Sequence, residues 1–185
     1  MAKGGKGNKN ISIVGGGKVS APVKAKTYAL FHGSPNANIE QFDLNMAGTN
    51  TSTGEKFLFF TDSKEVADDF SYERIPTDSF LFDRKGKKGK VYEVDVTLNH
   101  PLDFTNLTAK DKANLKKMSK DYIFGELSDK DIETYSTYNN QLFKTSIDLD
   151  KIKDYGYDGF IAKMDRQGHK EYAVLSEKQV KIKKK

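Results

Sequence analysis

The sequence has no cysteine among its 185 residues. This absence excludes disulfide bonds, zinc sites with thiolate ligands and a thiol nucleophile. No apolar run approaches the ~20 residues that a membrane-spanning helix needs. The N-terminal lysines also lack the apolar segment of a secretory signal. We therefore expect no membrane partner and a reducing compartment, the cytoplasm.

The chain has few apolar residues and many charged ones, at 36% and 31%. Its 12 phenylalanines and 9 tyrosines can nevertheless supply an aromatic core. The length favours one folded domain with polar insertions or tails. The formal net charge of +5 permits an acidic or nucleic-acid partner without requiring one.

Residues 1–26 form a zone of lysine and glycine with no acidic residue. This composition predicts a flexible basic arm, followed by a domain over 27–185. The arm is either a tether to an acidic surface or a solvated tail. Residues 84–90 form a second basic segment, a hairpin or loop, and 181–185 form a basic tail.

Apolar runs and alternating patterns predict strands at both ends of the domain and helices between them. Tyr92, Val94, Val96 and Leu98 alternate with polar residues, as in a half-buried strand. The expected strands cover 28–31, 56–61, 91–98, 157–162, 171–176 and 180–182, and the expected helices begin at Asp62, Thr108 and Ser128, with a short helical turn over 149–154. The stretch 103–150 is a helical insertion, and the fold class is α+β.

Three short segments combine polar chemistry with strand ends: Phe31-His32-Gly33-Ser34, Leu58-Phe59-Phe60-Thr61-Asp62 and Glu171-Tyr172-Ala173-Val174. The histidines at 32, 100 and 169 are not at metal-ligand spacing, so we expect no metal. His100 precedes a proline at a strand end and is expected to be structural, whereas His169 lies in a polar turn and is expected to be solvated. Glu171 begins an apolar strand, where its carboxylate either points into a cleft or pairs with a lysine.

Together, these segments resemble the ADP-ribosyltransferase superfamily, in the diphtheria-toxin and poly(ADP-ribose) polymerase branch marked by His, Tyr and Glu. The resemblance is closest to small members associated with phages and mobile elements, and it covers about residues 28–182. It implies a split, mixed and mainly antiparallel sheet with flanking helices. It also implies transfer of ADP-ribose from NAD, which is a substrate, with no metal.

The resemblance implies a role for six residues. His32 would bond the adenosine ribose, the Gly33 backbone would meet the nicotinamide carboxamide, and Ser34 would add a bond to that amide. Phe59 and Phe70 would form the two aromatic walls around nicotinamide. Glu171 would bond the ribose 2′-hydroxyl and stabilise the positive charge that develops when the glycosidic bond breaks.

One departure from the family pattern bears on activity. Phe59 stands where the family has tyrosine, which keeps the stacking face and loses a hydroxyl. The expected function is mono-ADP-ribosylation of a protein, nucleic-acid or ribonucleoprotein acceptor by a toxin, phage effector or defence component, with an antitoxin or target protein as a possible partner. The alternatives are a weakly active or inactive NAD- or partner-binding module of the same fold, and a basic nucleic-acid-binding accessory protein.

Overall fold

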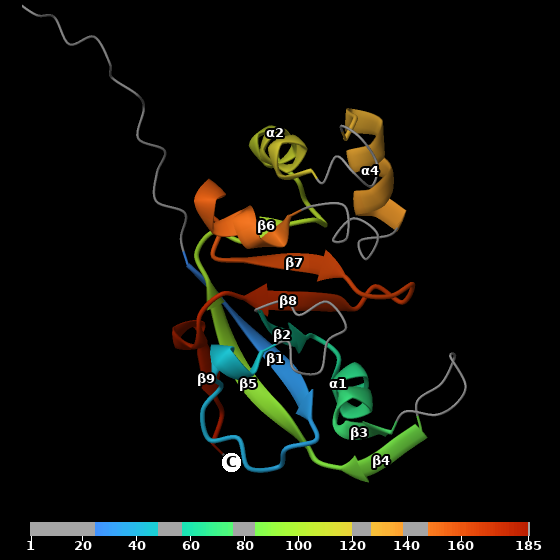
Figure 1. Cartoon of the computed structure of the whole chain (residues 1–185), viewed down its shortest axis with the longest axis vertical. Coiled ribbons are helices and arrows are strands. Elements are labelled where there is room, and N and C mark those ends of the chain that lie inside the picture. Colours follow the sequence, from blue (N-terminus) through green and yellow to red (C-terminus); the bar gives the residue numbers. More distant parts are fainter. Residues whose placement is uncertain (1–24, 48–56, 76–83, 120–126, 139–147, 185) are drawn as a thin grey trace, which may run out of the picture.

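The computed structural model describes residues 25–47, 57–75, 84–119, 127–138 and 148–184 (Figure 1). The predicted arm, apart from its last two residues, lies outside this part of the chain. The strands are β1 (Lys26–Ser34), β2 (Leu58–Thr61), β3 (Tyr72–Ile75), β4 (Arg84–Lys88), β5 (Lys90–Leu98), β6 (Leu102–Asp103), β7 (Gly159–Lys163), β8 (Lys170–Val174) and β9 (Val180–Ile182). The helices are α1 (Lys64–Phe70), α2 (Ala109–Met118) and α4 (Asp129–Tyr138), with 3-10 turns η1 (Leu44–Met46), η2 (Leu149–Tyr155) and η3 (Glu177–Gln179).

Seven strands form one sheet in the order β6-β7-β8-β2-β1-β5-β9. Only the β6–β7 pair is parallel, and the other pairs are antiparallel. Strand pairing is shortest near the centre of the sheet, where β1 and β2 share one register pair, Phe31 opposite Thr61. By contrast, β1 pairs with β5 from Lys26 to Ser34. The sheet is continuous but has its shortest pairing between β1 and β2, and we call this boundary the split. The α+β prediction is confirmed.

Alternation along the strands separates two cores. On β8, Ala173 joins one buried cluster, whereas Tyr172 and Val174 join the other. The first cluster packs α2, α4 and η2 onto β7 and β8, which agrees with the helices seen at that end of the sheet (Figure 1). The second cluster, which includes Phe42, covers the opposite face, and Ile39 packs against it. Each face of the central strands is thus buried by a different part of the chain.

A buried polar network fixes α2 to the segment that enters β7. The Tyr157 hydroxyl donates to Asp111 Oδ1 (2.6 Å) and accepts from Asn114 Nδ2 (2.9 Å). Burial, together with the Asp111 carboxylate, raises the pKa of Tyr157. His100 stacks on Tyr157, with ring centroids 4.9 Å apart, and its Nδ1 lies 2.9 Å from the Gly156 carbonyl oxygen. The structural role predicted for His100 is confirmed.

Helix starts follow local side-chain chemistry. Thr108 caps α2 with a full capping box to Asp111, as predicted. The prediction for α1 was wrong by one residue: Ser63, and not Asp62, is the N-cap, because its Oγ accepts the Val66 N–H. The Asp62 side chain instead accepts the Lys170 N–H of β8.

Strand β1 extends beyond the predicted segment 28–31. Its ladder to β5 continues through His32, Gly33 and Ser34, so these residues belong to a strand rather than to the loop that follows it. For the basic segment 84–90 the sequence left a hairpin or a loop open, and the structure has a strand over Arg84–Lys88, β4, which pairs with β3 in a separate antiparallel two-stranded sheet.

Candidate active site

The sheet places the three sequence segments on adjacent strands. Thr61 of β2 is the partner of Phe31 on one side and of Glu171 on the other. With a strand spacing of about 4.8 Å, the Glu171 backbone lies about 10 Å from β1. The predicted site residues of β1 and β8 therefore lie on the two sides of β2.

The His32 side chain forms a hydrogen bond between β1 and β2. Its Nδ1 lies 2.8 Å from the Phe59 carbonyl oxygen, which can only accept, so Nδ1 carries the proton. The ring packs edge-on against Phe42, at 4.8 Å between centroids. Burial lowers the pKa of His32, although the bond to the carbonyl opposes this shift. The neutral ring then leaves Nε2 as a hydrogen-bond acceptor, which suits the predicted bond to a ribose hydroxyl.

Gly33 is required by the packing of a helix. A Cβ atom at this position would lie 1.7 Å from the Ala67 carbonyl oxygen and 2.9 Å from the Ser71 nitrogen. The sequence interpretation attributed this glycine to close approach of a ligand, but the side that a Cβ would occupy is filled by α1. The next residue, Ser34, is buried, and its Oγ accepts the Asn36 N–H at 3.1 Å. Its hydroxyl therefore already shapes the loop after β1.

The two predicted aromatic walls lie in different environments. Phe59 is partly buried against the first core cluster, with ring centroids 6.1 Å from Phe57 and 6.2 Å from Phe160. It is the diagonal neighbour of Glu171 on the same face of the sheet, because their partners on the facing strand are two residues apart. Phe70, at the end of α1, is 50% exposed and has the Arg74 guanidinium 5.9 Å from its ring.

Glu171 occupies the second position of β8 and is half-buried. The residue before it is held in place by Asp62, whose Oδ1 accepts the Lys170 N–H at 2.8 Å. The Asp62 N–H in turn lies 3.4 Å from the Lys170 carbonyl oxygen. Asp62 was missed as a site residue, since an aspartate after a strand and before a helix also has the pattern of a cap. Its contact with residue 170 is visible only in the folded chain.

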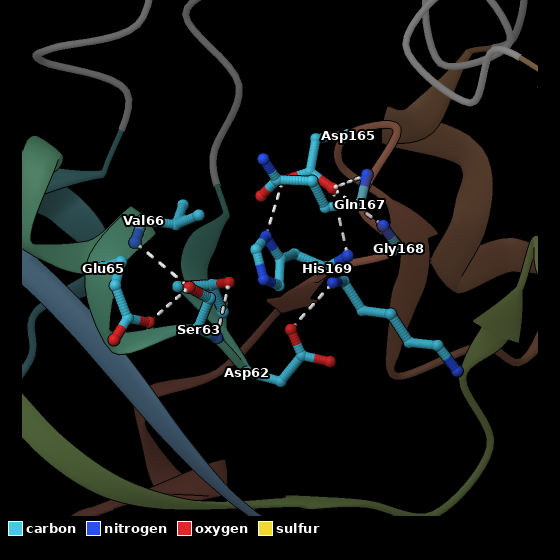
Figure 2. A network of polar contacts seen from close by, with 10 residues as sticks. Asp62, Ser63, Glu65, Val66, Asp165, Gln167, Gly168 and His169 are labelled. Carbon is cyan, nitrogen blue, oxygen red and sulfur yellow. Dashed lines mark hydrogen bonds and ion pairs between the residues drawn. The ribbon is translucent and has the colours of Figure 1, made fainter.

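The loop before Glu171 is more ordered than the sequence suggested. His169 was expected to be solvated, but its Nδ1 lies 2.6 Å from Asp165 Oδ2, and both side chains are 32% exposed. Figure 2 shows this loop beside Asp62, Ser63 and Glu65. The expectation that His169 is solvated was wrong. Asp165 lies four positions before His169, and the turn between β7 and β8 brings the two side chains together.

Two lysines of the β4 strand are paired with acidic residues. Lys85 and Lys88 each lie 2.6 Å from a carboxylate of α1, that of Asp69 and that of Asp68 respectively. Both ammonium groups also lie over the Tyr72 ring. These partners reduce the positive potential that the segment offers to a nucleic acid.

None of the six predicted site residues lines a hollow of about 430 Å³ in the described part of the chain. Its lining residues are Phe104, Thr105, Asn106, Leu107, Lys112, Glu133 and Lys163. Within the described ranges, no group of three or more His, Asp or Glu side chains is placed to hold a metal ion. No helix in this part of the chain is long and apolar enough to cross a membrane.

Comparison with known proteins gives one match. A family model described as ADP-ribosyltransferase in polyvalent proteins matches residues 25–184. Neither the curated proteins nor the solved structures include a match. The matched range begins one residue before β1 and ends two residues after β9, so it includes the whole sheet.

Proposed function

Because the chain belongs to the family of ADP-ribosyltransferases in polyvalent proteins, we propose that its donor substrate is NAD. The reaction would move one ADP-ribosyl group to a macromolecular acceptor and release nicotinamide. The main support is the register across the split, where Thr61 joins Phe31 of β1 to Glu171 of β8. This register supports the proposal, because the strand that carries Glu171 and the strand that carries His32 and Gly33 lie on the two sides of β2.

The proposed chemistry needs little more than positioning and charge. When the bond between nicotinamide and ribose breaks, its electron pair leaves with nicotinamide and positive charge builds on the sugar. The Glu171 carboxylate stabilises that charge more in the transition state than in the ground state. His32 Nε2 accepts a hydrogen bond from a ribose hydroxyl. Phe59 and Phe70 supply apolar surface that excludes water.

Replacement of the carboxylate by an amide tests the proposal. Glu171→Gln keeps the size of the side chain and removes its charge, so nicotinamide release should fall about 10²–10⁴-fold. Release is measured by chromatography of NAD reactions, and folding by the melting temperature. Glu177→Gln, in η3, is the matched control and should retain the parent rate. A Glu171→Gln protein as active as the parent would refute the assignment.

One observation favours a second candidate, a binding module without catalysis. Phe59 has no hydroxyl, and its backbone carbonyl is already bound by His32. Titration calorimetry with NAD, followed by the nicotinamide assay, separates the two candidates. Tight binding without release would favour the module.

We further propose that the chain acts in the cytoplasm as a phage or mobile-element effector. This proposal rests on the sequence resemblance to small members of that kind and on the description of the matched family. Labelled NAD added to a bacterial lysate, with protease and nuclease treatments afterwards, would show whether a protein or a nucleic acid accepts the label.

A further inference from the structure

The loop between β7 and β8 holds a histidine in the geometry of a general base. Asp165 Oδ1 accepts backbone N–H groups of Gln167 (2.9 Å), Gly168 (2.9 Å) and His169 (3.1 Å). Its other oxygen, Oδ2, is bound by His169 Nδ1 at 2.6 Å. Figure 2 shows the carboxylate enclosed by its own loop, with the imidazole beneath it. The turn depends on Gly168, whose φ of 95° suits glycine.

These contacts fix which nitrogen of His169 can take a proton. Partial desolvation would raise the pKa of Asp165, but the hydrogen bonds from His169 and the backbone outweigh it and lower that pKa. The ionised carboxylate only accepts, so Nδ1 donates and Nε2 of the neutral ring keeps its lone pair. Among the described residues, Nε2 has no hydrogen-bond partner, and Glu65 of α1 adds a negative charge nearby. A base whose second nitrogen is held by a carboxylate is the arrangement that activates nucleophiles in many enzymes.

The same loop places His169 beside Glu171. The β7–β8 ladder continues past β8, since the Met164 N–H donates to the His169 carbonyl oxygen at 2.7 Å. His169 lies in the turn just before β8 and two residues before Glu171, so their α-carbons are at most about 7 Å apart. The Asp62 contact with Lys170 fixes the residue between them.

We propose that His169, oriented by Asp165, is the general base that takes the proton of the acceptor, and that the acceptor group is a hydroxyl. This inference rests on the proposed function. The acceptor oxygen bonds to C1′ of the ribose, the C1′–nitrogen bond to nicotinamide breaks, and the electron pair leaves with neutral nicotinamide. The hydroxyl proton passes to Nε2 and then to solvent. A carboxylate acceptor is already ionised at neutral pH and would need no base.

The test uses two small nucleophiles in place of the unidentified acceptor. Water must lose a proton when it attacks, whereas the azide anion has none to lose. His169→Asn keeps an N–H donor toward Asp165 and removes the base. With water, its nicotinamide release should fall about 10²-fold below the parent rate. With azide, release should return to near the parent rate and give ADP-ribosyl azide, detected by mass spectrometry.

Two controls separate a base from a structural residue. NAD affinity by calorimetry and the melting temperature of His169→Asn should match those of the parent. His100→Asn changes a histidine that stacks on Tyr157 in the core and should leave both rates unchanged. If His169→Asn lowers the melting temperature, His169→Gln takes its place in the same assay.

Each other outcome overturns the base assignment. A parent-like rate of His169→Asn with water would show that no proton passes to this ring. Equal losses with water and azide would show that His169 shapes the site without acting as a base. A parent chain that releases no nicotinamide with either nucleophile would refute the proposed function, and the base with it. That failure is distinct because Glu171→Gln and the parent would then be indistinguishable.

Discussion

His32 shows how one side chain can serve both the fold and the candidate site. Its Nδ1 binds the Phe59 carbonyl across the split, where the sheet has a single register pair. Its Nε2, the acceptor of the neutral ring, is the atom proposed to bind a ribose hydroxyl. The same burial that makes the bond to Phe59 stronger also disfavours the charged ring. A lower pH should therefore weaken the contact between β1 and β2.

The pH dependence of stability tests this role of His32. Burial lowers its pKa below the ordinary 6.5, so between the two pKa values the unfolded chain binds more protons than the folded one. Its contribution is complete above pH 6.5 and is lost as the pH falls toward the folded pKa. The free energy of unfolding in urea should fall between about pH 7 and pH 5. The His32→Asn side chain keeps an N–H donor for the Phe59 carbonyl but does not titrate, so the free energy of unfolding of this variant should fall less with decreasing pH. An equal pH dependence in the variant and the parent would exclude His32 as the cause.

At the scale of elements, α1 links the two sides of the candidate site. Its first turn, capped by Ser63, faces the His169 loop (Figure 2). Its last turn lies against Gly33 of β1. The helix is short, so its stability comes from these packed ends rather than from helix propensity. A change at either end should therefore be transmitted to the strands that carry the candidate residues.

Gly33→Ala tests this helix–strand contact. The added Cβ would lie 1.7 Å from the Ala67 carbonyl oxygen, and this backbone atom cannot move without shifting α1. We expect a loss of ~3 kcal/mol in the free energy of unfolding, measured in urea. Gly86→Ala is the control, because its nearest neighbours, at 3.0 Å, are side-chain atoms of Glu73 and Ile75. A loss at Gly33 no larger than the loss at Gly86 would contradict the close packing of α1.

At the scale of the whole molecule, the excess positive charge belongs to one part of the chain. The net charge is +5, and residues 1–24 contain Lys3, Lys6, Lys9, Lys18 and Lys24 with no acidic residue or arginine. The remaining chain is therefore formally neutral. Within it, basic groups such as Lys85 and Lys88 are paired with carboxylates. Any long-range attraction to an acidic polymer should come from the first 24 residues.

Deletion of residues 1–24 tests this separation. The family match begins at residue 25 and β1 at Lys26, so the melting temperature should stay unchanged. Binding to a labelled single-stranded RNA, measured at two salt concentrations, should weaken with salt for the full chain and be lost in the shortened one. RNA binding that survives the deletion would locate the contact in the folded domain.

Local patterns in the sequence predicted most of the strands and helices, and they carried the family resemblance. Alternation at Val94 and Val96, the Thr108 cap and the strand at 180–182 depend on neighbours in the chain, so local patterns predict them. The order of the His32, Phe59 and Glu171 segments likewise indicated the family that the chain-wide match then showed. The roles of these residues in catalysis stay predictions.

The partners that several of these residues contact are set by the folded chain and not by local sequence. It joined Asp62 to Lys170 and packed Ala67 against Gly33, contacts between residues far apart in the sequence. It also turned an apparently solvated His169 into the partner of Asp165. The physical reason is common to all three: a polar or small residue leaves several local choices open, and the partner brought to it by the fold decides between them.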